Sequence, residues 1–282
     1  MRLTLLGTGS PESYLRRASS GYLVDLGGET IQFDCGGGSF GRMLEAGYKP
    51  TDIDRLFFSH LHTDHMMDYA RLVHARWDDG RGELPVHGPA PIGTITERLF
   101  GRDGAYFADL TARTEHEPSK EIWLERGGSL PRPWPAPKVV EEQPGYSVQG
   151  EGWTLRSCKV PHAQPFLTCM GYRVDSAGKS VVYSGDSGPC DALTELSRDA
   201  DILIHMCFNL SQEARGPEWL WGSSGHKEVA ATAAAANVKT VILTHFRPHM
   251  DAEGMHDQIK AEMSEIYKGD IVIGEDLMTF DL

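Results

Sequence analysis

Apolar residues along the chain fall into short runs of strand length, separated by glycine- and proline-rich turns and by segments of helical periodicity. In the first half this pattern predicts strands over Leu3–Leu6, Gly21–Leu26, Thr30–Asp34, Asp54–Ser59 and Pro85–Pro89. It predicts helices over Gly41–Ala46, Met66–Trp77 and Ile92–Phe100.

The second half repeats this arrangement after residue 153. Strands are expected over Leu155–Val160, Gly171–Asp175, Ser180–Ser184, Ile202–Ile204, Val241–Thr244, Ile271–Ile273 and Leu277–Phe280. Helices are expected over Asp191–Ser197, Lys227–Ala236 and Met255–Tyr267. Two blocks of strands that each end in helices indicate an α/β protein with a pair of sheets covered by helices on both outer faces. Because no linker interrupts the pattern, we expect a single domain over 1–282.

The segment from about 100 to 150 shows the weakest pattern. Its part from Gly127 to Gly145 contains five prolines and has little periodicity. Long irregular insertions in compact domains often cover a site. We therefore expect an insertion that forms a lid or pocket wall over the active site. A surface insertion with no role at the site would give the same pattern.

Composition and charge limit the functional classes. The chain has 40% hydrophobic and 24% charged residues, as in an ordinary globular protein, and a formal net charge of −13. That charge disfavours a nucleic-acid partner unless basic residues are concentrated locally. The five cysteines contain no CxxC pair, which indicates free thiols in a reducing compartment. With no signal peptide or membrane span apparent, we expect a cytoplasmic protein.

The strongest chemical signal is the cluster His60-Leu61-His62-Thr63-Asp64-His65, which directly follows an apolar strand. At the end of a strand His60 and His62 point the same way, because side chains alternate with a period of two. Asp64 and His65 lie just beyond, where a turn can direct them to a second cation. Anchored groups of histidine and aspartate are typical of metal sites.

Three further candidate ligands occur downstream, each at the end of a predicted strand. His162 follows Val160-Pro161, Asp186 follows Ser184-Gly185, and His245 follows Leu243-Thr244. Singly each signal is weak, but together they supply two imidazoles and one carboxylate that a folded sandwich can bring to the cluster.

In this order the motifs resemble those of the metallo-β-lactamase superfamily, whose fold is a four-layer αββα sandwich with two mixed sheets. The finer pattern is most similar to the branch of the tRNA 3′-processing nuclease, tRNase Z. The shared features are Leu6-Gly7-Thr8-Gly9-Ser10-Pro11, Phe33-Asp34-Cys35-Gly36, Gly225-His226 and Leu243-Thr244-His245-Phe246. The resemblance spans nearly the whole chain and weakens over residues 100 to 150.

The resemblance implies a hydrolase with two divalent cations, zinc first and manganese or iron as alternatives. It assigns His60, His62 and His162 to the first cation, Asp64, His65 and His245 to the second, and Asp186 to both. Two cations about 3.5–4 Å apart can share and deprotonate one water, which gives a bridging hydroxide.

Other residues receive supporting roles. The resemblance makes Asp64 and His226 the catalytic residues, with His226 as a proton donor to the leaving group, although helix capping would also place a histidine there. Asp34 is expected to orient the metal loops. Trp219, Trp221, Arg247 and His249 are candidates for the pocket lining.

The expected substrate is a small-molecule ester, lactone or related compound, for three reasons. The tRNase Z branch carries a long basic arm between its third and fourth motifs, whereas only 23 residues separate His162 from Asp186 here. Its His-Glu-Ala-Thr loop is replaced by His205-Met206-Cys207-Phe208, and the net charge is acidic. Aromatic residues of the insertion, namely Phe107, Trp123, Trp134 and Tyr146, would suit a small, partly apolar substrate.

Two alternatives stay open for the activity. One is a phosphodiesterase acting on cyclic or short nucleotides, and the other is an iron-containing redox protein that needs a flavin partner. A homodimer is compatible with all of these interpretations.

Overall fold

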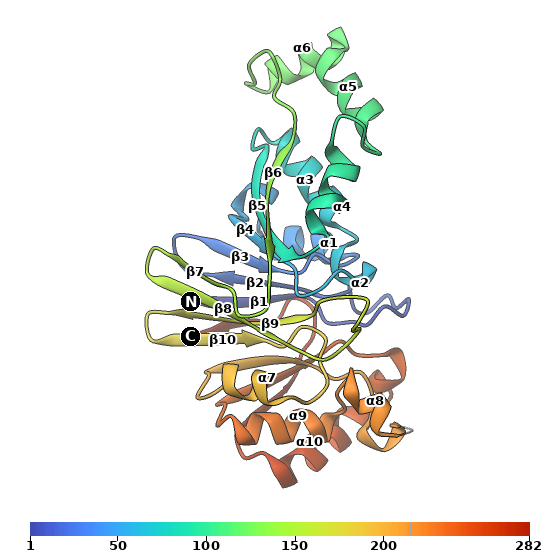
Figure 1. Cartoon of the computed structure of the whole chain (residues 1–282), viewed down its shortest axis with the longest axis vertical. Coiled ribbons are helices and arrows are strands. Elements are labelled where there is room, and N and C mark those ends of the chain that lie inside the picture. Colours follow the sequence, from blue (N-terminus) through green and yellow to red (C-terminus); the bar gives the residue numbers. More distant parts are fainter. Residues whose placement is uncertain (215) are drawn as a thin grey trace.

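The computed structural model describes residues 1–214 and 216–282 and contains two mixed seven-stranded sheets packed face to face (Figure 1). The first sheet has the order β14 (Thr279–Asp281), β1 (Arg2–Gly7), β2 (Gly21–Asp25), β3 (Thr30–Phe33), β4 (Arg55–Phe57), β5 (Glu83–Pro89) and β6 (Ala136–Glu142). The second has the order β13 (Asp270–Ile273), β12 (Thr240–Thr244), β11 (Ile202–Met206), β10 (Lys179–Tyr183), β9 (Met170–Ser176), β8 (Trp153–Lys159) and β7 (Ser147–Gly150).

Helices cover the outer face of each sheet. The first sheet carries α1 (Ser39–Glu45), α3 (Tyr69–Asp78) and α4 (Ile92–Phe100), and the second carries α7 (Asp191–Leu196), α9 (His226–Ala235) and α10 (Met255–Ile266). The short helices α2 (Thr63–Met66) and α8 (Pro217–Trp221) lie at one end of the sandwich, where 3₁₀ turns span Ser211–Glu213 and Pro248–Asp251. The expected αββα class is therefore confirmed.

Three apolar cores hold these layers together. The central core lies between the sheets and contains aromatic residues such as Phe33, Tyr172 and Tyr183, all of them buried. Two outer cores join each sheet to its helices. Strands such as β1, β10 and β11 are buried on both faces, which explains why their sequences are continuous apolar runs rather than alternating ones.

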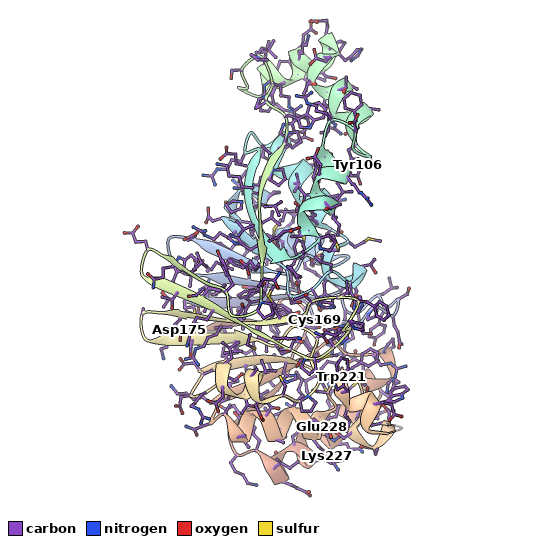
Figure 2. All side chains as sticks on the ribbon, viewed as in Figure 1. Tyr106, Cys169, Asp175, Trp221, Lys227 and Glu228 are labelled. Atoms are coloured by element: carbon purple, nitrogen blue, oxygen red, sulfur yellow. The ribbon has the colours of Figure 1, made fainter. Side chains whose placement is uncertain are left out.

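Residues 100 to 150 depart from the expectation of an irregular cover. They contain α5 (Phe107–Glu115), α6 (Glu117–Glu125) and β6, and the two helices project from the sandwich as an arm (Figure 1). Tyr106, just before α5, lies well away from Trp221 in this view (Figure 2). The proline-rich stretch was expected to be a loop, but its residues 136–142 pair with β5 in parallel register.

Three of the four aromatic residues expected above the metals pack within or beside the arm instead, and Tyr146 lies near His87 of β5. The Trp123 ring packs on the Arg132 guanidinium at 4.5 Å, and Trp134 lies 6.0 Å from Phe107. The indole N–H of Trp134 donates to the carbonyl of Phe100. Because two short helices on an extension have no sheet to cover them, these large side chains supply their core.

Among the described residues, no helix is long and apolar enough to cross a membrane.

Candidate metal site

Four strand ends meet at one end of the sandwich and bring the predicted ligands together. The cluster from His60 to His65 follows β4 and enters α2, and His162 follows β8. Asp186 follows β10 and His245 follows β12, at the carboxyl ends of two parallel strands that flank β11. In an open sheet such ends are where binding residues gather.

The first group contains His60, His62, His162 and Asp186, whose ligand atoms lie within 4.8 Å of one another. His62 Nδ1 lies 3.0 Å from His60 Nε2 and 3.3 Å from His162 Nε2. Asp186 Oδ2 lies 3.5 Å from His162 Nε2. Three imidazole nitrogens and a carboxylate thus surround one position.

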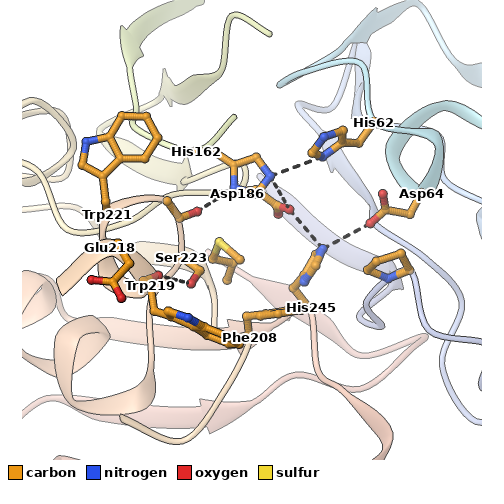
Figure 3. Close-up of a pocket in the computed structure, with 13 residues that line it drawn as sticks. His62, Asp64, His162, Asp186, Phe208, Glu218, Trp219, Trp221, Ser223 and His245 are labelled. Atoms are coloured by element: carbon orange, nitrogen blue, oxygen red, sulfur yellow. Dashed lines mark hydrogen bonds and ion pairs between the residues drawn. The ribbon is translucent and has the colours of Figure 1, made fainter. Parts of the chain in front are cut away.

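The second group contains Asp64, His65, Asp186 and His245 within the same limit. Asp64 Oδ2 lies 3.4 Å from His65 Nε2 and 3.2 Å from His245 Nε2. Asp186 Oδ1 faces His65 Nε2 at 3.5 Å. Its Oδ2 lies 3.2 Å from His245 Nε2 (Figure 3). Asp186 therefore belongs to both groups.

Hydrogen bonds on the far side of the imidazole rings fix the direction of the ligand atoms. Nδ1–H of His162 donates to the carbonyl of Gly222 at 2.6 Å, and Nδ1 of His60 lies 3.0 Å from the Ser59 hydroxyl. Both rings consequently present Nε2 to the site, the arrangement that imidazole ligands usually have. Gly222 is required for this approach, because a Cβ there would lie 2.4 Å from the His162 carbonyl oxygen.

Asp34, which the sequence predicted to orient the metal loops, is hydrogen-bonded to the loop that carries the ligands. It is fully buried, and its Oδ2 accepts hydrogen bonds from His65 Nδ1–H at 2.7 Å, from the Tyr183 hydroxyl at 2.6 Å and from the Ser59 hydroxyl at 2.8 Å. Its Oδ1 accepts from the Ser59 backbone N–H. Asp34 thus joins both sheets to the ligand loop, and Tyr183 is a partner that no sequence signal indicated.

The electrostatics of the site favour bound cations. Burial alone would raise the pKa of Asp186, but the charges and hydrogen bonds of His245 and His65 hold it well below the usual range. Burial would lower the pKa of His245, yet Asp186 and Asp64 raise it to about 9. Burial and the neighbouring imidazoles lower the pKa of His60. Divalent cations bind donor sets of ionised carboxylates together with imidazoles that are neutral or that release their proton when the metal binds.

Unpartnered polar atoms support the same interpretation. His65 Nε2 and Asp186 Oδ1 are buried without a hydrogen-bond partner, although buried polar atoms are normally satisfied. Both atoms belong to the second group of candidate ligands. The residues present therefore fit a divalent cation.

A cavity of about 310 Å³ opens beside the ligands. Its walls include His62, Asp64, His162, Asp186 and His245, and also Pro11, Met206, Phe208, Glu218, Trp219, Trp221, Gly222 and Ser223. Trp219 and Trp221 were candidates for this lining, whereas Glu218 and Met206 carry no sequence signal that would have found them. Among the described lining residues there are none from 100–150, so the expected cover over the site is not seen.

The other two candidates for the lining lie outside this set. Arg247 donates to Glu12 at 2.6 Å, with its guanidinium 5.1 Å from the Phe208 ring. His249 pairs with Glu213 at 3.1 Å.

His226 does not face the cavity. It is fully buried at the start of α9, its Nδ1 accepts the Ser211 backbone N–H at 3.2 Å, and its Nε2–H donates to Glu262 of α10 at 3.0 Å. Lys227 also binds Glu262 at 2.8 Å. Both ring nitrogens are therefore engaged in joining α9 to its neighbours, an arrangement that differs from the expected proton donor.

Comparison with known proteins agrees with this fold and donor set. Residues 29–246 match the family model described as the beta-lactamase superfamily domain. The chain belongs to the metallo-β-lactamase superfamily and is a hydrolase of that class.

Within the superfamily the chain stands near the ribonuclease Z branch. It is 32% identical over 283 residues to a Ribonuclease Z of Mycobacterium sp. (strain KMS), covering 98% of this chain and 94% of that protein. It is also 32% identical to a Ribonuclease Z of Mycobacterium avium (strain 104), covering 98% and 96%. We expected a small-molecule partner and considered a nucleic acid unlikely. That expectation is wrong, because the relatives that match almost the whole chain are named Ribonuclease Z. Net charge misled because it counts side chains only and leaves out the cations that the two ligand groups can bind.

Solved structures share the fold at lower identity. The metallo-β-lactamase fold protein YhfI from Bacillus subtilis has a TM-score of 0.76 and 22% identity, covering 99% of this chain and 98% of that one. The short form of human tRNase Z has a TM-score of 0.71 and 19% identity, covering 100% of this chain and 99% of that one.

Proposed function

We propose that this protein is a metal-dependent phosphodiesterase that cleaves RNA. The similarity to Ribonuclease Z over 98% of the chain carries the choice of substrate class. The two ligand groups that share Asp186 fit that chemistry. Two cations bound there, zinc being our first candidate, would activate a water and stabilise negative charge on the phosphoryl oxygens.

The residues of the chain divide the work in this proposal. His60, His62 and His162 would hold one cation, and Asp64, His65 and His245 would hold the other. Asp186 would contribute to both, and Asp34 orients the His65 ring through the hydrogen bond to its Nδ1–H. Because these groups are buried or half-buried and already aligned, little reorganisation is needed when the phosphodiester arrives.

RNA recognition must differ from that of nucleases that carry a long arm between the positions corresponding to His162 and Asp186. Residues 163–185 here form β9, β10 and their connections, and both strands are interior strands of the second sheet. The projecting arm of this chain instead lies between the His60–His65 cluster and His162, and consists of residues 107–125.

A substrate panel tests the proposal. Purified protein supplied with zinc or manganese is incubated with a hairpin RNA bearing a single-stranded 3′ extension, with cyclic nucleotides, and with an aryl ester and a lactone. We expect endonucleolytic cleavage of the RNA. This activity should be lost when a chelator is added and should return when metal is supplied again. An Asp186→Asn variant purified in parallel controls for contaminating nucleases. Turnover of the ester or lactone without RNA cleavage would contradict the proposal.

A further inference from the structure

The cavity has two chemically distinct halves. One half is formed by the candidate metal ligands, and the other by Phe208, Trp219 and Trp221 (Figure 3). Trp221 is 51% exposed, an unusual state for the largest apolar side chain. Exposed aromatic surface that continues a binding cavity commonly marks a ligand contact.

The position of Trp221 is tied to the metal half. Its neighbour in the chain, Gly222, receives the 2.6 Å hydrogen bond from His162 Nδ1–H. A second hydrogen bond, from the Ser223 hydroxyl to the Trp219 carbonyl at 2.7 Å, holds the backbone on both sides of Trp221. The backbone that carries the Trp221 indole is therefore anchored to a candidate ligand of the first cation.

Charge excludes a phosphate from the aromatic half. Among the residues that the structure describes, no lysine or arginine lines the cavity, and Glu218 adds a negative charge beside the tryptophans. Arg247, whose guanidinium lies 5.1 Å from the Phe208 ring, is paired with Glu12 at 2.6 Å. A phosphate would consequently bind at the metals, while the aromatic wall suits an uncharged planar group.

We propose that Trp221 forms a stacking site for the base of an unpaired nucleotide next to the scissile phosphate. This inference rests on the proposed RNA substrate and names how the same site selects it. A base within a duplex is already paired and stacked, so only a nucleotide free of a helix can turn its face to the indole. The site thereby directs cleavage to single-stranded positions without a basic surface.

Abasic substrates isolate this contact. The RNA carries an abasic residue immediately 5′ or immediately 3′ of the scissile phosphate, and kcat/KM is compared with that of the complete RNA. For the wild-type protein we expect the complete RNA to be favoured by roughly 5- to 150-fold at one of the two positions, the range for one base stacked on one aromatic side chain. Trp221→Ala should abolish this preference and raise KM for the complete RNA more than it lowers kcat. Trp221→Phe should restore part of it.

The control is Phe107→Ala, which removes a 41% exposed aromatic side chain from the arm and should leave the preference unchanged. Circular dichroism and thermal unfolding verify that each variant is folded. If RNA is cleaved but Trp221→Ala keeps the wild-type preference at both positions, the stacking site is refuted while the proposed function stands. If no RNA is cleaved by the wild-type protein, the proposed function itself fails.

Discussion

Asp34 Oδ2 lies 2.7 Å from His65 Nδ1, so a buried carboxylate at the end of β3 holds a candidate metal ligand that follows β4. The same oxygen accepts the Tyr183 hydroxyl from the opposite sheet. One buried oxygen thus couples the packing of the sandwich to the orientation of the site. Carboxylates in this position also make the imidazole a stronger ligand.

Replacing Asp34 by asparagine should weaken metal binding. The amide presents N–H groups where His65, Ser59 and Tyr183 now donate, so at least one of these donors loses its acceptor. We expect metal affinity to fall by about 10- to 100-fold, with RNA cleavage partly recovered at high metal concentration. Competition with a metal chelator measures the affinity. Asp175→Asn, on β9, is the matched control, and an Asp34→Asn protein with wild-type affinity would exclude the orienting role.

Removing a candidate ligand from either group should abolish turnover and release metal. His162→Ala empties the first group of one imidazole, and His245→Ala does so in the second. We expect each variant to stay folded and to retain fewer equivalents of metal than the wild-type protein, as measured by elemental analysis after dialysis. His116→Ala, an exposed histidine of the arm, serves as control. Full activity in either ligand variant would rule out a site that needs both groups.

His226→Ala should affect stability more than catalysis. The substitution removes the acceptor of the Ser211 N–H, which costs about 1–3 kcal/mol of unfolding free energy. It also removes one donor to Glu262, which keeps Lys227 and Gln258. Because the imidazole points away from the cavity, the loss in kcat should be much smaller than in a ligand variant. Urea unfolding and single-turnover RNA cleavage measure the two effects. Glu262→Gln should reproduce part of the destabilisation, whereas a kcat loss as large as that of His245→Ala would make His226 catalytic.

His205 should make the protein sensitive to acid. Burial lowers its pKa to about 4, while the unfolded chain has an ordinary histidine. Between about pH 6.5 and pH 4 the unfolded state therefore binds the proton more readily, and stability falls as pH falls, by at most about 1.4 kcal/mol per pH unit. Above this window the effect vanishes.

The comparison that isolates this effect is His205→Asn against wild type, both treated with chelator, by urea unfolding at pH 7, 6, 5 and 4.5. The variant should lose less stability on acidification, because asparagine does not titrate and its amide can donate to the Met206 carbonyl as Nδ1–H does now. His116→Asn should keep the wild-type slope. Equal slopes for the His205 variant and wild type would mean that other groups set the acid sensitivity.

The sequence by itself determined the layers and the candidate ligands. Continuous apolar runs specify buried strands, and each ligand follows such a run directly, as His60 follows Phe57-Phe58-Ser59. A strand end is a local feature, because the strand fixes where the next residues emerge. The convergence of the two ligand groups then follows from the strand order that the structure shows.

Only the tertiary structure decided the direction of His226, the use of residues 100 to 150 as an arm, and the aromatic wall at Trp221. His226 meets Glu262 across 36 positions of the chain, and Asp34 meets Tyr183 across 149. Such partners depend on how helices and sheets pack, which no local pattern encodes. The net charge of −13 was also misleading, because it is a sum over side chains and takes no account of bound cations. The folded chain brings two groups of candidate ligands together, and cations held there would attract a phosphate.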